Sequence, residues 1–279
     1  MESAIYIVAT PIGNLSDITL RALDTLRQVD LIAAEDTRHT RRLLDHHGIG
    51  TKMSSLHEHN ELGRSESIVD SVLAGKSVAL VSDAGTPLIS DPGHTLVDLA
   101  KSKGVRVIPV PGPSALIAAL SVSGIACGKF IFEGFLPAKR KGKQDVLTTY
   151  LNEKKAVIFY ESPHRILDTL AVMVEVFGDR DLTVARELTK RFETVYRDRL
   201  PGIIDWMQAD QNQQKGEFVL VLSGSKLEPA ESSEAEKKKL LSRLLEDLPP
   251  KKASALVAEM LGGSKKEIYN MSLALKDNK

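Results

Sequence analysis

Short apolar runs alternate with amphipathic stretches through the first half of the chain. The stretches at 67–73 and 95–101 separate such runs and have the spacing of helices with one buried face. Strands that alternate with helices form a largely parallel sheet covered by helices. We therefore predict an N-terminal α/β domain over residues 1–115, with strands in the apolar runs at 5–8, 31–34, 78–81 and 105–110.

The pattern changes after a helix that we predict at about 113–123. The later apolar runs follow one another with little helical signal between them, so we expect some antiparallel pairing. They predict a second α/β domain over residues 116–225, with strands at 130–135, 156–160, 182–185, 193–196 and 217–222.

A segment rich in Pro, Ser and Glu at 226–234 is predicted to be a linker. Beyond it, breaks at Pro249-Pro250 and Gly262-Gly263 divide the sequence into three predicted helices. We expect a small helical domain at 235–279, similar to a helix-turn-helix, with helices at 235–245, 251–261 and 264–275.

Three predicted strands of the first domain end in loops of small residues, at 10–13, 82–87 and 111–115. In parallel sheets, ligands bind at the carboxyl ends of the strands, so these loops together predict one site. The first loop, which leads into a helix expected from Ser16 or Asp17, lacks both G-x-G-x-x-G and the P-loop signature. This favours a nucleotide-like ligand that carries little phosphate, although the loop at 82–87 alone could equally be a helix-capping turn.

Two predicted strands of the second domain end in charged residues: Glu161 on one, and Arg186, Glu187 and Lys190 on the other. Groups of this kind can hold or move a proton once burial and neighbouring charges tune them. Glu161 and Lys190 are the first candidates for catalysis, with Arg186 and Glu187 after them. The alternative is a structural ion pair between Glu161 and Arg186.

Basic residues cluster in two places, although Lys plus Arg and Asp plus Glu both total 37 and any attraction to nucleic acid must be local. The basic loop holds Lys139, Arg140, Lys141 and Lys143, and the tail holds Lys251, Lys252, Lys265 and Lys266. Either cluster could contact phosphates. Alternatively, the basic loop could be a plain solvated loop, and the tail could be a helical cap packed on its own core.

The cysteine count, the histidines and the length of the apolar runs limit the kinds of site and the cellular location that we expect. Cys127 is the only cysteine, which excludes internal disulfides and Cys-rich zinc sites. His57 and His59 would share one face of a strand, but no third ligand is evident, so we predict no metal. There is no signal-like leader and no apolar run of membrane length, which makes the cytoplasm the expected location.

Several segments together resemble the tetrapyrrole-methylase superfamily of S-adenosylmethionine-dependent methyltransferases. Within it the chain is most similar to the branch that methylates ribosomal RNA. Tetrapyrrole enzymes have a more glycine-rich first loop and G-G-D in the second, whereas this chain has Thr10-Pro11 and Val81-Ser82-Asp83. The likeness covers nearly the whole chain and includes the Lys-rich tail and the segments 6–15, 34–38, 81–87, 132–137, 159–165 and 186–190.

The resemblance implies two α/β domains with S-adenosylmethionine in the cleft between them, a homodimer, and no metal. It implies 2′-O-methylation of cytidine 1402 in the 16S rRNA of the small ribosomal subunit. Carried over by motif, the cofactor contacts are Pro11, Ile12, Gly13, Val81, Ser82, Asp83, Thr86, Ser114, Ala115, Tyr160 and Leu188.

Two other interpretations remain open from the sequence. A tetrapyrrole C-methyltransferase would share the cofactor loops but gives no reason for the basic loop or tail. A ligand-sensing regulator would bind the cofactor and nucleic acid without transferring a methyl group.

Overall fold

The computed structural model describes residues 1–57, 60–226 and 234–277, with side chains as far as residue 275. It divides into two compact units. The α/β unit comprises residues 1–150 and 155–223, and the helical unit comprises 151–154 with 224–279. Each is described by itself.

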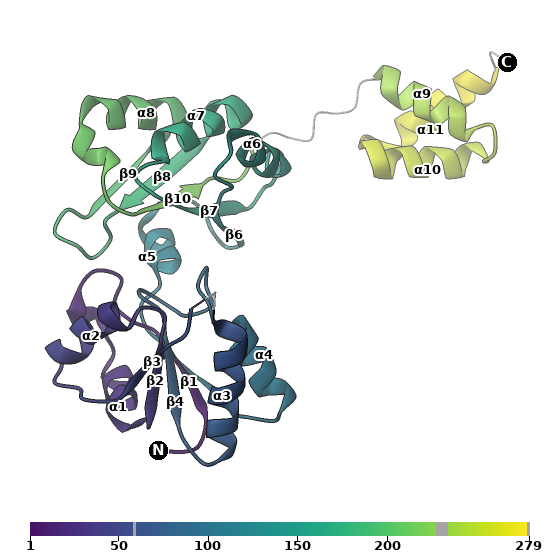
Figure 1. Cartoon of the computed structure of the whole chain (residues 1–279). Helices are drawn as coiled ribbons and strands as arrows, with labels where there is room; N and C mark the ends of the chain where they lie inside the picture. The colour runs from purple at the N-terminus through teal and green to yellow at the C-terminus, as the bar shows by residue number, and fades with distance from the viewer. Residues whose placement is uncertain (58–59, 227–233, 278–279) are drawn as a thin grey trace. The chain divides into compact units, whose positions relative to one another are not determined.

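The first sheet of the α/β unit is entirely parallel, as predicted (Figure 1). Its strands lie in the order β3-β2-β4-β1-β5, with Ile5 of β1 in register with Val78 of β4 and Val107 of β5. The ranges are β1 (Ile5–Val8), β2 (Leu31–Ala34), β3 (Met53–Ser55), β4 (Val78–Val81) and β5 (Val107–Val110).

Helices cover both faces of this sheet (Figure 1). One face packs on Leu26 and Leu44, from α1 (Leu20–Gln28) and α2 (Thr37–His46). The other packs on Val72 and Leu96, from α3 (Glu61–Leu73) and α4 (His94–Ser102). Alternate residues of each strand serve the two faces, which is why β4 is buried throughout.

The helix expected from Ser16 or Asp17 begins later. Residues Leu15–Asp17 form a short 3-10 turn, η1, and α1 starts at Leu20. The hydroxyl of Thr19 caps α1 by accepting a hydrogen bond from the Ala22 N–H at 3.1 Å. The true cap therefore lies two or three residues beyond the predicted start.

The second sheet is mixed, in the order β6-β7-β10-β8-β9. β10 runs antiparallel to β7 and β8, and β8 runs antiparallel to β9, which confirms the expected antiparallel pairing. The strands are β6 (Phe130–Phe135), β7 (Ala156–Glu161), β8 (Asp181–Arg186), β9 (Thr194–Arg199) and β10 (Phe218–Leu222). The helices are α5 (Ala115–Val122), α6 (Arg140–Thr149), α7 (Ile166–Phe177) and α8 (Leu200–Ala209), with a short turn η2 (Gln211–Gln214).

The helical unit contains α9 (Glu234–Leu244), α10 (Pro250–Leu261) and α11 (Lys265–Asp277), which confirms the three predicted helices (Figure 1). They pack around a core of their own formed by Leu241, Ala253, Val257 and Ile268. In the described parts of the chain, no helix has both the length and the apolar character needed to span a membrane.

Candidate active site

Hydrogen bonds tie together the three small-residue loops of the first sheet. The N–H of Thr10 donates to the carbonyl of Gly85 at 2.8 Å, and the N–H of Gly85 donates to that of Thr10 at 3.0 Å. The Thr86 hydroxyl donates to the Pro113 carbonyl at 3.1 Å. Gly85 has a φ of 83°, a left-handed conformation that glycine adopts without strain. The predicted convergence of the loops is confirmed.

A cavity of about 450 Å³ opens at these loops, and it is lined by the loops that follow strands of the first sheet and by strands of the second sheet. Tyr160 at the end of β7 presents its ring there, packed edge-on against Phe132 and Phe135. The Tyr160 hydroxyl accepts a hydrogen bond from the Leu116 N–H in the first turn of α5, at 3.2 Å. Of the predicted cofactor contacts, those that line the cavity are Ile12, Asp83, Thr86, Ser114, Ala115, Tyr160 and Leu188.

The other predicted contacts belong to the same loops and strand but do not line the cavity. Pro11, Val81 and Ser82 are buried. Gly13 instead lies against the loop that follows β8. A Cβ at Gly13 would lie 2.4 Å from Lys190 Cγ and 3.0 Å from the Leu188 carbonyl, so only glycine permits this approach.

Sequence reasoning missed several residues of the cavity wall. Glu35 directly follows β2, so the strand-end rule that identified Asp83 could also have found it. Ser90 and Asp91 lie in a loop between β4 and α4, where no motif or spacing marked them. Phe135 closes β6 and reaches the cavity as well.

Acidic residues dominate the charge of this cavity: Glu35, Asp83, Asp91 and Glu217 line it, whereas no Lys or Arg of the described residues does. Burial raises the pKa of Asp91 to about 6. The negative charges of Glu35 and Asp83 raise this pKa further, whereas a hydrogen bond with Ser82 lowers it. Burial also raises the pKa of Glu35; the hydrogen bond from the Asp83 N–H opposes this rise, and the negative charge of Asp83 adds to it. Such a wall suits a cationic ligand and disfavours phosphates.

Non-glycine residues with left-handed backbones occur in two loops beside the cavity. Leu88 and Ser90 have φ of 72° and 68°, and Glu187 and Thr189 have φ of 51° and 64°. Such conformations cost roughly 1–3 kcal/mol each and concentrate at functional sites. Ser90 and Leu188, which lies between Glu187 and Thr189, both line the cavity.

Lys190 does not line the cavity itself but lies between two glutamates, of which Glu217 does. Its ammonium is 2.8 Å from Glu187 Oε1 and 2.9 Å from Glu217 Oε2. Burial lowers the pKa of Lys190, but the hydrogen bonds and charges of the two glutamates outweigh it and raise the pKa above its ordinary value. Lys190 is therefore a fixed positive charge, unsuited to act as a base at neutral pH.

Glu161 and Arg186 belong to separate hydrogen-bond networks, so the ion pair considered between them is wrong. Arg186 donates to the carbonyls of Lys215 and Phe192, both at 3.1 Å. The Glu161 side chain has no exposed surface, and its oxygens accept from the Ser162 N–H at 2.8 Å and the Thr169 hydroxyl at 2.5 Å. A carboxylate so enclosed is not free to meet a substrate.

The basic segment at 139–143 differs from its prediction, because Arg140 begins α6 and the segment is a helix start rather than a loop. Lys139 and Lys141 are exposed. Arg140 pairs with Asp168 and Glu175, and Lys143 has no exposed surface. Because it is buried, Lys143 cannot make the predicted contact with phosphate at the surface.

The four tail lysines are exposed at the starts of helices, Lys251 and Lys252 on α10 and Lys265 and Lys266 on α11. Of the histidine pair, His57 contacts Asn60 at 3.1 Å, and His59 lies outside the described residues. The described residues contain no group of three or more His, Cys, Asp or Glu able to hold a metal ion.

Comparison with known proteins supplies the family. Residues 4–204 match the family described as Tetrapyrrole (Corrin/Porphyrin) Methylases, and residues 231–276 match the RsmI C-terminal HTH domain. The chain is 51% identical over 271 residues to a ribosomal RNA small subunit methyltransferase I from Pseudomonas aeruginosa, covering 96% of each chain. It is 50% identical over 270 residues to the protein of that name from Vibrio cholerae, covering 96% of this chain and 94% of that one.

Solved structures share the fold at low sequence identity. A diphthine synthase superposes with a TM-score of 0.60 at 16% identity, over 80% of this chain and 91% of that one. A cobalt precorrin-4 methyltransferase superposes with a TM-score of 0.58 at 17% identity, over 79% and 95%.

Proposed function

Since this chain belongs to the tetrapyrrole methylase family, and within it to the ribosomal RNA small subunit methyltransferase I proteins, we propose that it 2′-O-methylates cytidine 1402 of 16S rRNA with S-adenosylmethionine as donor. The observation that carries the proposal is the extent of the match: identity of 50% over 96% of the chain, with family matches in both the cavity-bearing unit and the helical unit. We propose further that the protein is a cytoplasmic homodimer.

The cavity fits S-adenosylmethionine in size, charge and position. Its volume of about 450 Å³ falls in the range of small-molecule sites. When bound, the cofactor supplies an electrophilic methyl group on a positively charged sulfur. Asp83 and Asp91 offer that cation two carboxylates, Ile12 and Tyr160 offer apolar surface, and Ser114 opens the first turn of α5.

Methyl transfer to a ribose hydroxyl requires alignment and stabilisation of the oxygen as it becomes negative. Lys190 is placed to supply the positive charge, held by Glu187 and Glu217. Glu217 lines the cavity and its side chain is 77% exposed, so it is open to take the hydroxyl proton. Arg186 and Glu161 support the two strand ends that carry this site.

The pKa of Asp91 leads to a pH-dependent cofactor affinity. Below pH 6 the carboxyl is largely neutral, and above pH 6 it is ionised and attracts the cationic cofactor. We expect the dissociation constant of S-adenosylmethionine, measured by calorimetry, to fall by several-fold between pH 5 and pH 7. Asp91→Asn should bind more weakly at pH 7 and lose most of this dependence, and an unchanged dependence in that variant would contradict the assignment.

The tail lysines are expected to dock RNA without taking part in chemistry. Reversing Lys251, Lys252, Lys265 and Lys266 to glutamate removes up to four positive charges from the RNA interface. The slope of log affinity against log salt should fall by roughly 0.7–0.9 for each phosphate that is no longer neutralised. The measurement is binding to small subunits between low and moderate salt. Cofactor affinity should stay at the wild-type value, and an unaltered salt slope would exclude the docking role.

The experiment that tests the function is methyl transfer from labelled S-adenosylmethionine to small ribosomal subunits, followed by mass mapping of the 16S rRNA. We expect the label on the ribose of cytidine 1402, and loss of that methyl in cells without the protein. A tetrapyrrole methyltransferase would label no RNA, and a regulator would bind cofactor and nucleic acid without turnover.

A further inference from the structure

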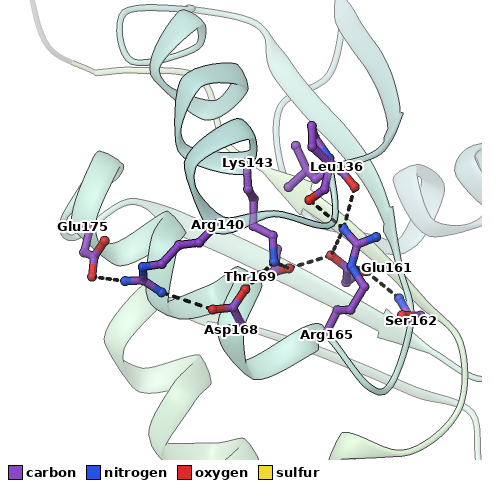
Figure 2. Close-up of polar contacts among 10 residues, drawn as sticks. Leu136, Arg140, Lys143, Glu161, Ser162, Arg165, Asp168, Thr169 and Glu175 are labelled. Carbon is purple, nitrogen blue, oxygen red and sulfur yellow. Dashed lines mark hydrogen bonds and ion pairs between the residues drawn. The ribbon is translucent and has the colours of Figure 1, made fainter.

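Of the basic residues at the start of α6, Lys143 is buried and the half-exposed Arg140 lies beside it; Figure 2 shows the contacts of both with α7. Lys143 places its ammonium 2.6 Å from Asp168 Oδ2 and 2.8 Å from Thr169 Oγ1, both on α7. Arg140 contacts the other oxygen of Asp168 at 3.1 Å. The hydrogen bond from Lys143 is the largest influence that holds the pKa of Asp168 below its ordinary value.

The contact between Lys143 and Thr169 fixes the direction of a hydrogen-bond chain. An ammonium only donates, so the Thr169 oxygen accepts from Lys143 and its single proton is left for another acceptor. That acceptor is Glu161 Oε2, at 2.5 Å. Lys143 therefore sets the orientation of the Thr169 hydroxyl, and the hydroxyl in turn holds the carboxylate of Glu161 (Figure 2).

The far end of this hydrogen-bond chain joins two walls of the cavity. Glu161 Oε1 accepts from the Ser162 N–H at 2.8 Å, and it lies 3.2 Å from Arg165 Nε. The same guanidinium donates to the carbonyls of Leu136 and Pro137, directly after β6 (Figure 2). Ser162, after β7, and Phe135, which precedes Leu136 at the end of β6, both line the cavity. Glu161 and Arg165 therefore fasten the ends of β7 and β6 to each other.

We propose that Lys143 is a positioning residue of the methyl-transfer site, which acts through Thr169 and Glu161 on the cavity wall formed by the ends of β6 and β7. The inference rests on the proposed function. Lys139 and Lys141, on the outward side of the same segment, remain free to meet the RNA backbone. One short segment thus contacts the substrate on one side and holds the reaction site on the other.

Stability alone gives little reason for a lysine here. Replacing buried ionic groups with apolar residues of similar volume is often neutral or stabilising. Asp168 would keep its contact with Arg140, and its side chain is 48% exposed, so no uncompensated buried charge would remain. The ammonium at position 143 is therefore best explained by the geometry it imposes.

The test compares two variants of α6 in the full-length protein by steady-state and single-turnover methylation of small subunits. Lys143→Met is expected to lower kcat by about tenfold or more through misplacement of the wall, with KM for subunits near wild type. Lys141→Met is expected to do the reverse: KM for subunits should rise, and the single-turnover rate at saturating subunits should stay at the wild-type value. Gln144→Met, exposed on the same helix, controls for the substitution itself.

A second pair of variants makes the result independent of how well Lys143→Met folds. Thr169→Val removes the hydroxyl and should reproduce the loss in kcat, whereas Thr169→Ser restores it and should recover most of the rate. The proposal is overturned if Lys143→Met raises KM without lowering kcat, or if folded Thr169→Val keeps the wild-type rate. Failure of the proposed function is separate, because then the wild-type protein itself would transfer no methyl group to subunits.

Discussion

Replacement of Ala115 by tryptophan is expected to abolish cofactor binding while the fold survives. Ala115 begins α5 next to Ser114 and lines the cavity of about 450 Å³, so an indole at this position would occupy space that the cofactor needs. We expect the dissociation constant for S-adenosylmethionine to rise by at least about 100-fold, or ~2.7 kcal/mol. Calorimetry measures this directly.

The matched control is Ile117→Trp, which adds an indole to the same helix at a position that is 52% exposed and outside the cavity wall. This variant should bind the cofactor normally. Wild-type affinity in a folded Ala115→Trp protein, with a melting temperature like that of the control, would show that the cofactor binds elsewhere.

Replacement of Lys190 by methionine is expected to slow the chemical step itself. The Lys190 ammonium is fixed by Glu187 and Glu217, and its raised pKa keeps it positive at neutral pH, where it can stabilise the developing oxyanion. Single-turnover methylation with saturating cofactor and subunits should fall by at least about tenfold, or ~1.4 kcal/mol of barrier. Cofactor affinity and melting temperature should change little.

Lys103→Met serves as the control for Lys190→Met, since it also breaks a lysine–carboxylate contact, at 3.0 Å to Asp70, but at the end of α4. It should transfer methyl groups at the wild-type rate. A Lys190→Met protein that melts early yet reacts normally would assign Lys190 to structure, and the reaction would then depend on alignment and exclusion of water.

Strands buried on both faces were predictable from sequence because they consist almost entirely of apolar residues. β2 and β4 begin and end where their apolar runs do. β9 was placed less well, because it is an edge strand whose residues are mostly exposed and therefore polar, and it continues to Arg199. Only its first residues resembled a strand.

The start of α6 shows why charge patterns alone mislead. A segment with four basic residues and Gly142 has no helical signature, and it forms a helix because Lys143 and Leu147 are buried against neighbours distant in sequence. The same limit applies to Asp91, whose environment depends on its burial and on the charges of Glu35, at the end of β2, and of Asp83, earlier in its own loop. The loops of the candidate site were visible locally, whereas the partners of each charge were set by tertiary packing.

The most direct test of the central claim is methylation of reconstituted small subunits that carry 2′-deoxycytidine at position 1402. If the acceptor is the ribose oxygen, these subunits should gain no labelled methyl group there, while subunits with cytidine at 1402 are methylated under the same conditions. Labelled methyl on the deoxy nucleotide would place the acceptor on the base and contradict the account.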